Sequence, residues 1–538
     1  MSGKRRPAER RFGQAGGCPL ALLALAAATL SHAPAQPHDL VIRHGRVVDG
    51  TGNPAFYADV AIRDGRIAAI GRVAGQAADE LDATGLVVAP GFIDVHTHAD
   101  ELAEMPEAEN FLRMGVTTVV AGNCGDSALE PGRAFAAIEG RGVCINFATL
   151  VGHGTVRRAA MGGSFNRSPT PAELEKMRDL VERAMQQGAV GLSTGLIYAP
   201  GVYADTEEII ELAKVVARYD GLYATHQRNE STGIFESLNE VFRIARTAGL
   251  RAQVSHLKLA GEKAWGRAAE VLAHIEKARA SGLDITQDQY AYTASSTGIS
   301  QLIPDEALEG GRDRFRERLD DPAEKARIIE TMRRKIHARG RQDYAFCVIA
   351  SYRHDPSLNG LDLVQAARKQ RGADSLDDQI ETILEIQRHG GASAVFHGMH
   401  EDDLQTFLRH PNTMVACDSG LRKPGEGVPH PRGYGNNARV LARYVRELHL
   451  LRLEDAIRKM TSLPAATFRF EGRGLLRPGC HADVVVFDPA TVRDVATYKD
   501  PHHYAVGFRH VLVNGVPVIR DERLTGARPG RVLRHRPD

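Results

Sequence analysis

Residues 91–98 read GFIDVHTH, an apolar run that ends in two histidines separated by one threonine. A short apolar run of this kind is typical of a buried β-strand. Because side chains alternate across a strand, His96 and His98 point to the same side. The stretch therefore predicts a buried strand that carries two imidazoles at its C-terminal end.

Further strand-like stretches follow along the chain, and segments such as 171–188 and 234–249 between them are helical in pattern. Alternating strands and helices indicate a parallel sheet with crossover helices. Eight such units in roughly 330 residues predict a (β/α)8 TIM-like barrel. We place it at residues 91–472, with an insertion at about 300–395 after the seventh strand. The other predicted strands are 116–123, 145–152, 189–196, 222–227, 251–258, 284–292 and 413–420.

The two ends of the chain have a different pattern of short, alternating strands. Residues 38–90 contain an Asp64-Gly65 turn, and residues 475–530 contain an Asn514-Gly515 turn. Both dipeptides are typical of β-hairpins. We therefore expect a small β-sandwich domain to which both ends contribute strands.

The first 35 residues have the three parts of a secretory signal peptide. A basic segment precedes PLALLALAAATL, and the small residues of SHAPAQ offer cleavage after Ala33 or Ala35. The apolar stretch is too short to span a bilayer. We expect a periplasmic or secreted protein without stable membrane insertion after cleavage. The alternative is an alanine-rich tail on a cytoplasmic protein.

The bulk composition argues against several classes of partner. Lys and Arg number 68 against 67 Asp and Glu, so no net field attracts nucleic acid or an anionic membrane. Aromatic residues make up only 6% of the chain, which also disfavours base-stacking surfaces. A small molecule is the expected partner. The oligomeric state stays open.

Potential metal ligands gather at the ends of the predicted strands. In a barrel, the C-terminal ends of all strands open onto one face, where active sites are built. Imidazole and thiolate bind zinc well, and a carboxylate can complete the site. A thiolate between two zinc ions could also bridge them. The candidate residues are His96, His98, Cys124, His226, His256 and Asp418.

Each of these residues has an ordinary structural interpretation when taken alone. Free cysteine is often simply buried, and Asp418 could begin a turn before Gly420. Past the predicted signal, five cysteines remain, an odd number that does not suggest a disulfide framework. The coincidence of six ligand types at strand ends favours the metal site.

The motifs PGFIDVHTH, GNCG, STGLIYAPG, THQRNE, SHLK, ASST, DSG and HPR follow one another in order. In this series the chain resembles the N-acyl-D-amino-acid deacylase (D-aminoacylase) family of the amidohydrolase superfamily. The resemblance implies a tightly bound zinc ion on Cys124, His226 and His256. It also implies a second, weaker position near His96 and His98, with Asp418 as the catalytic carboxylate.

Substrate contacts are expected around this centre. A donor such as Tyr198 would stabilise the oxyanion, and Arg432 or Lys258 would bind the α-carboxylate of an acyl amino acid. The resemblance adds Tyr290, Ser295 and Ser296 as secondary contacts.

The chain departs from the family pattern around the substrate pocket. Tyr290-Ala291-Tyr292 replaces a Tyr-Pro-Tyr run, residues 298–311 lack an expected Pro-Trp pair, and Ile197 replaces a bulkier apolar residue. The expected reaction is zinc-dependent hydrolysis of N-acyl-D-amino acids. Hydrolysis of a cyclic amide (hydantoinase- or dihydropyrimidinase-like) or of an acyl dipeptide is the alternative, and a catalytically inactive binding scaffold is a third possibility.

Overall fold

The eight expected barrel strands are present in the computed structural model, which describes residues 38–74 and 77–535; the predicted signal peptide lies outside this range. Successive strands are parallel neighbours, and the pairing of Ser419 with Thr97 and of Gly420 with His98 closes the ring. The barrel prediction is confirmed. Its strands are β6 (Phe92–Asp94), β7 (Thr97–His98), β8 (Val116–Ala121), β9 (Asn146–Thr149), β10 (Val151–Gly152), β11 (Gly191–Gly195), β12 (Leu222–His226), β13 (Arg251–Val254), β14 (Ile285–Gln289), β18 (Thr413–Val415) and β19 (Ser419–Gly420).

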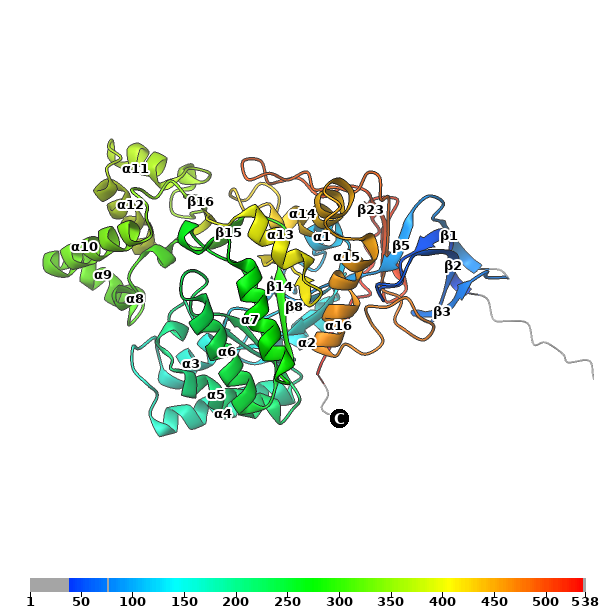
Figure 1. Cartoon of the computed structure of the whole chain (residues 1–538), viewed down its shortest axis with the longest axis horizontal. Coiled ribbons are helices and arrows are strands. Elements are labelled where there is room, and N and C mark those ends of the chain that lie inside the picture. Colours follow the sequence, from blue (N-terminus) through cyan, green and yellow to red (C-terminus); the bar gives the residue numbers. More distant parts are fainter. Residues whose placement is uncertain (1–37, 75–76, 536–538) are drawn as a thin grey trace, which may run out of the picture. The chain divides into compact units, whose positions relative to one another are not determined.

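Amphipathic helices cover the outside of the barrel (Figure 1). In α6, apolar side chains recur every three or four residues and are buried against neighbouring elements. Thr170 and Glu173 form a capping box that starts α4. These helices are α1 (Glu109–Leu112), α2 (Pro131–Arg141), α3 (His153–Met161), α4 (Pro171–Gln186), α5 (Thr206–Ala217), α6 (Ile234–Ala248), α7 (Ala268–Ala280), α13 (Glu401–Arg409), α14 (Arg432–Arg439), the π-helix η5 (Val440–Glu447), α15 (Leu453–Met460) and α16 (Ser462–Phe468), with short 3-10 turns η1 (Gly201–Tyr203) and η2 (Glu262–Ala264).

An additional subdomain lies in the chain between β14 and α13. Its strands form an antiparallel sheet in the order β15–β17–β16, and it has an apolar core of its own. Figure 1 shows its helices grouped together. The elements are β15 (Ala294–Gly298), η3 (Ile299–Leu302), α8 (Asp305–Leu308), α9 (Arg312–Asp320), α10 (Pro322–Ala338), β16 (Cys347–Ser351), η4 (Pro356–Leu358), α11 (Leu363–Arg371), α12 (Leu376–Arg388) and β17 (Ser393–His397).

Both ends of the described chain build the small β domain, as expected. β20 pairs with β5, which joins the N-terminal and C-terminal strands. The nine strands are hydrogen-bonded into one sheet around a shared apolar core, rather than into two separate sheets. They are β1 (His38–Val47), β2 (Phe56–Arg63), β3 (Arg66–Gly71), β4 (Ala77–Asp82), β5 (Val87–Pro90), β20 (Val484–Phe487), β21 (Phe508–Val513), β22 (Val516–Arg520) and β23 (Arg523–Leu524).

None of the described helices is both long and apolar enough to cross a bilayer.

Candidate metal centre

The strand ends carry the six predicted ligand candidates to one place. Three of these residues, Cys124, His256 and Asp418, have positive φ angles of 55°, 35° and 51°. Non-glycine residues rarely adopt this conformation, and it is concentrated at functional sites. The backbone therefore turns sharply where each strand ends, and the side chains face the barrel mouth.

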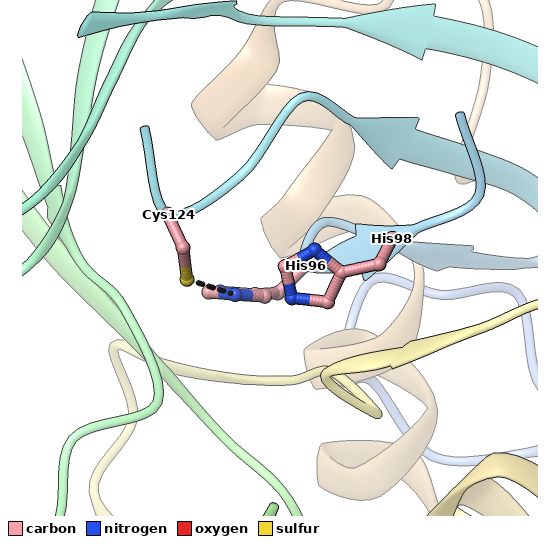
Figure 2. A group of neighbouring side chains, drawn as sticks. All are labelled: His96, His98 and Cys124. Carbon is pink, nitrogen blue, oxygen red and sulfur yellow. Dashed lines mark hydrogen bonds between the residues drawn. The ribbon is translucent and has the colours of Figure 1, made fainter. Parts of the chain in front are cut away.

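Cys124 is the central residue of the cluster. Its Sγ lies 3.3 Å from Nε2 of His96, 3.9 Å from Nδ1 of His226 and 3.7 Å from Nε2 of His256. Figure 2 shows the thiol facing His96, with His98 beside it. Three groups have all their ligand atoms within 4.8 Å of one another: His96–His98–Cys124, Cys124–His226–His256 and His96–His256–Asp418.

These separations fit a zinc ion. Zinc lies about 2.3 Å from a thiolate and about 2.0–2.1 Å from an imidazole nitrogen, so tetrahedral coordination holds the two ligand atoms about 3.6 Å apart. The distances from Cys124 to His226 and His256 differ from this value by no more than a few tenths of an ångström. The donor set of one thiolate with imidazoles is also one that zinc prefers.

Two glycines allow Cys124 to approach the barrel wall. A Cβ on Gly195 would lie 2.1 Å from the carbonyl oxygen of Cys124, and one on Gly125 would lie 2.8 Å from the Gly195 nitrogen. Gly125 also has a positive φ of 80°. The glycines of GNCG and STGL are therefore needed for close backbone packing.

The surroundings of Cys124 favour the thiolate. Burial raises the pKa of this thiol, but the charge of His96 and hydrogen bonds from His226 and His256 outweigh burial and hold the pKa well below its ordinary value. The thiolate is the form that binds metal.

Asp418 is fixed from two sides. Its Oδ1 lies 3.3 Å from Nε2 of His98 and 3.6 Å from Nε2 of His96, whereas its Oδ2 lies 2.9 Å from NH1 of Arg432. Burial raises the pKa of this carboxyl, but Arg432 and the nearby imidazoles hold it well below the ordinary range. Asp418 is therefore ionised at neutral pH.

Glu230 is a functional residue that the sequence reasoning missed. Its Oε1 lies 3.0 Å from Nδ1 of His256 and 2.6 Å from Nζ of Lys258, and its Oε2 lies 3.4 Å from Nε2 of His226. It faces the nitrogens that point away from Cys124. A carboxylate in this position fixes the tautomer and the ring orientation of a ligand histidine. The one feature of the sequence that could have indicated this residue is its position in the motif THQRNE, four residues after His226.

Asp288 was also missed, although it is a charged residue within a predicted buried strand. Its side chain accepts a hydrogen bond of 2.9 Å from the backbone nitrogen of His256 and lies 3.7 Å from Nδ1 of His96. It is fully buried. Asp288 therefore supports the two strand ends that carry these histidines.

A cavity of about 790 Å³ opens over the cluster and includes most of the predicted site residues. Two predicted residues do not line it: His96 is fully buried, and Tyr290 is fully buried with its hydroxyl 3.4 Å from the Met399 sulfur. The predicted residues that line it are His98, Cys124, His226, His256, Asp418, Tyr198, Lys258, Ser295, Ser296 and Arg432.

The cationic candidates for the α-carboxylate already have protein partners. Arg432 pairs with Asp418 and stacks over the Tyr290 ring at 4.6 Å, and Lys258 pairs with Glu230. Tyr198 accepts a hydrogen bond of 2.9 Å from Thr297, and its hydroxyl also lies within hydrogen-bond distance, 3.5 Å, of Nδ1 of His226.

The described cysteines are all free thiols, which agrees with the odd number past position 18. Among these described cysteines, Cys124 is the one whose sulfur contacts the ring nitrogens of three histidines.

A (β/α)8 barrel with a cysteine, histidines and a carboxylate at the mouth defines a metal-dependent hydrolase. Comparison with known proteins agrees: residues 79–519 match the model of the amidohydrolase family. The D-aminoacylase of Alcaligenes xylosoxydans xylosoxydans is 38% identical over 94% of this chain and 99% of that protein.

Two solved structures are similar to this chain over most of its length. The N-acyl-D-glutamate deacylase of Bordetella bronchiseptica, complexed with zinc and a phosphonate that mimics the tetrahedral intermediate, has a TM-score of 0.80 and 38% identity, covering 93% of this chain and 100% of its own. The second is a D-aminoacylase described as having a binuclear metal centre, with one-metal activation and second-metal attenuation. It has a TM-score of 0.80 and 36% identity, and the match covers 93% of this chain and 100% of that protein. This chain belongs to the N-acyl-D-amino-acid deacylase family of amidohydrolases.

Proposed function

We propose that this protein is a zinc-dependent hydrolase that cleaves N-acyl-D-amino acids into a D-amino acid and a carboxylate. The observation that carries the proposal is the separation of Cys124 Sγ from the ligand nitrogens of His226 and His256, which matches tetrahedral zinc. Family membership gives the reaction type.

Cys124, His226 and His256 are the proposed tight zinc site. His96 and His98 are the proposed weaker site, and the thiolate of Cys124 lies close enough to these imidazoles that it could contribute to this site as well. Zinc bound there would polarise the amide carbonyl and make water nucleophilic at neutral pH. Binding requires the Nδ1–H of His256 to donate to Glu230, because Nε2 then keeps a lone pair for the metal.

Asp418 is the proposed proton carrier. Its Oδ1 faces the histidine cluster, where it accepts a proton from the attacking water and passes it to the amide nitrogen of the leaving amine. Arg432 holds the other oxygen, so the carboxylate cannot rotate away.

Tyr198 is the proposed donor to the oxyanion. Burial and the charge of Cys124 raise the pKa of its phenol well above the ordinary value, so the hydroxyl keeps its proton. Its oxygen lies 3.5 Å from Nδ1 of His226, beside the proposed tight site.

Direct assay tests the proposal. Zinc-loaded protein is incubated with N-acetyl-D-methionine, N-acetyl-D-glutamate, their L forms, hydantoin and an acyl dipeptide, and free amino acid is measured by chiral chromatography. Release of D-amino acids alone supports the proposal. Turnover of hydantoin without D-amino acid release would favour the cyclic-amide alternative. Absence of stoichiometric zinc and of any turnover would favour an inactive scaffold.

We also propose that the protein is exported. The support is the three-part pattern of residues 1–35. Fractionation of expressing cells with N-terminal sequencing tests this proposal, and an unprocessed cytoplasmic protein would refute it.

A further inference from the structure

A second cavity, next to the one over the metal centre, lies in the additional subdomain. Its volume is about 550 Å³. Four segments line it: the end of β15 with the start of η3, the first residue of α9, the stretch after β16, and the connection from α12 to β17 (Figure 1). Gly298 and Ser393 line both cavities, which are therefore neighbours. The proposed hydrolysis gives this second cavity no role.

The lining of the second cavity is basic. Its ionisable side chains are those of Arg312, Arg353, His354 and His389, and no aspartate or glutamate lines it within the part of the chain that the structure describes. Its other polar side chains are those of three serines and Gln387. Because every ionisable group in the wall is either positive or neutral, the cavity favours an anion.

Contacts between neighbouring residues place the basic groups along one wall. The guanidinium of Arg312 lies against Gly390, where an added Cβ would be 3.4 Å from its NH2. His389 directly precedes Gly390, and its ring stacks on the ring of His354 with centroids 4.0 Å apart and 13° between the planes. Arg353 is the residue before His354. The four basic side chains therefore belong to one continuous stretch of the cavity wall.

The small sheet of the subdomain contributes neutral donors. Ser393 in β17 is paired with Ser351 in β16 and with Gly298 in β15, and the first two of these residues carry hydroxyls into the lining. A serine hydroxyl rotates to donate to whichever acceptor is present. The strands therefore add hydrogen-bond donors to a cavity whose charge comes from α9 and the two loops.

The charges of the two arginines are not compensated by the protein. Arg312 and Arg353 make no hydrogen bond or ion pair with another described residue, and both side chains are exposed. An exposed guanidinium without a carboxylate partner has all of its donors available to a ligand.

Three carboxylates belong to residues next to this wall, but none of them pairs with either cavity arginine. Asp313 lies 3.8 Å from Arg316, and Glu385 lies 2.9 Å from Nε2 of His389. Asp355 accepts a hydrogen bond of 3.1 Å from a backbone nitrogen at the start of η4. The wall therefore keeps its positive charge.

We propose that this cavity binds a phosphate group, either as free phosphate or as part of an organic molecule. A phosphate presents acceptor oxygens in several directions and matches the fork of a guanidinium, so it can engage arginines, imidazoles and hydroxyls together. A carboxylate has two oxygens in one plane and would leave more of these donors unused. The inference does not depend on the proposed hydrolysis.

Calorimetric titration of the zinc-loaded protein tests the proposal. The probes are inorganic phosphate, glycerol phosphate, adenosine monophosphate and acetate. We expect a phosphate site with a Kd below about 1 mM that does not bind acetate. Tighter binding of an organic phosphate would identify that source, and equal or tighter binding of inorganic phosphate would identify the free ion.

Arginine variants locate the site. Arg312→Gln and Arg353→Gln should each weaken phosphate binding about three- to tenfold, and the double variant about tenfold or more, because each loses charge-assisted hydrogen bonds from an exposed guanidinium. Arg314→Gln is the matched control and should keep wild-type affinity. Arg314 is exposed further along α9, pairs with Glu317 and does not line the cavity.

The metal centre is a second place where phosphate can bind, so its contribution has to be removed. Cys124→Ala is expected to lose the tightly bound zinc, and it should keep the phosphate site. Circular dichroism verifies that each variant is folded. Loss of phosphate binding in folded Cys124→Ala would overturn the proposal. So would unchanged affinity in the double arginine variant, acetate binding as tight as phosphate at this site, or no phosphate binding at all.

Discussion

Replacing Glu230 with glutamine removes one negative charge and nearly preserves the size of the side chain. The carboxylate contacts the outward nitrogens of both His226 and His256 and also holds Lys258. Loss of such a partner typically weakens metal binding about 10- to 100-fold for one ligand. Because Glu230 serves two proposed zinc ligands, we expect the affinity for zinc to fall about 100-fold, which is about 2.7 kcal/mol.

Stability should fall as well, for a separate reason. Lys258 is only 3% exposed, so the variant leaves a buried ammonium without its carboxylate. Breaking a buried pair in this way typically costs about 3–5 kcal/mol. The double variant Glu230→Gln/Lys258→Met should regain part of this stability without regaining zinc affinity.

Zinc affinity is measured by competition with a fluorescent chelator, and unfolding by urea titration of the same samples. Glu208→Gln is the control, because Glu208 is even more deeply buried than Glu230 and pairs with His153 and Arg157, but does not line the cavity. It should lose stability and keep wild-type zinc affinity. Zinc affinity within about threefold of wild type in Glu230→Gln would refute the orienting role.

Three further predictions concern individual residues. Cys124→Ala should lose the tightly bound zinc and the activity together, and a variant with stoichiometric zinc and normal turnover would exclude the ligand role. Asp418→Asn should keep its zinc and fold while kcat falls by about 10²–10⁴, as measured with saturating substrate; a near-normal kcat would remove Asp418 from proton transfer. Burial lowers the pKa of Lys459 to about 7, so from about pH 7 to 10 the unfolded chain binds more protons and stability should rise with pH by about 3 kcal/mol. Melts across this range should show the rise in wild type and lack it in Lys459→Met; equal slopes would contradict the assignment.

The sequence was sufficient for the barrel because its strands are short apolar runs with polar residues at their ends. Cys124, His226 and Asp418 are informative in this way: each follows or ends such a run, and parallel strands bring these ends to one face. The β domain could also be predicted from the sequence, because Asp-Gly and Asn-Gly turns indicate β-hairpins locally.

Pairing between distant side chains could not be read from the sequence. Arg432 was expected to hold a substrate carboxylate, and its place beside Asp418 depends on how the loop after β19 folds back. Glu230 lies in a loop, where no strand or helix period indicates which way a side chain points. Tyr290 was expected as a secondary substrate contact from the family resemblance, and in the structure its ring lies beneath Arg432 and Lys258. These positions are set by tertiary packing, which one-dimensional spacing does not encode.

Anomalous diffraction at the zinc edge from zinc-loaded crystals tests the central claim most directly. The account predicts a peak bonded to Cys124 Sγ at about 2.3 Å and to Nδ1 of His226 and Nε2 of His256 at about 2.0–2.1 Å. A zinc position without sulfur in its coordination, or no peak at the barrel mouth, would contradict it.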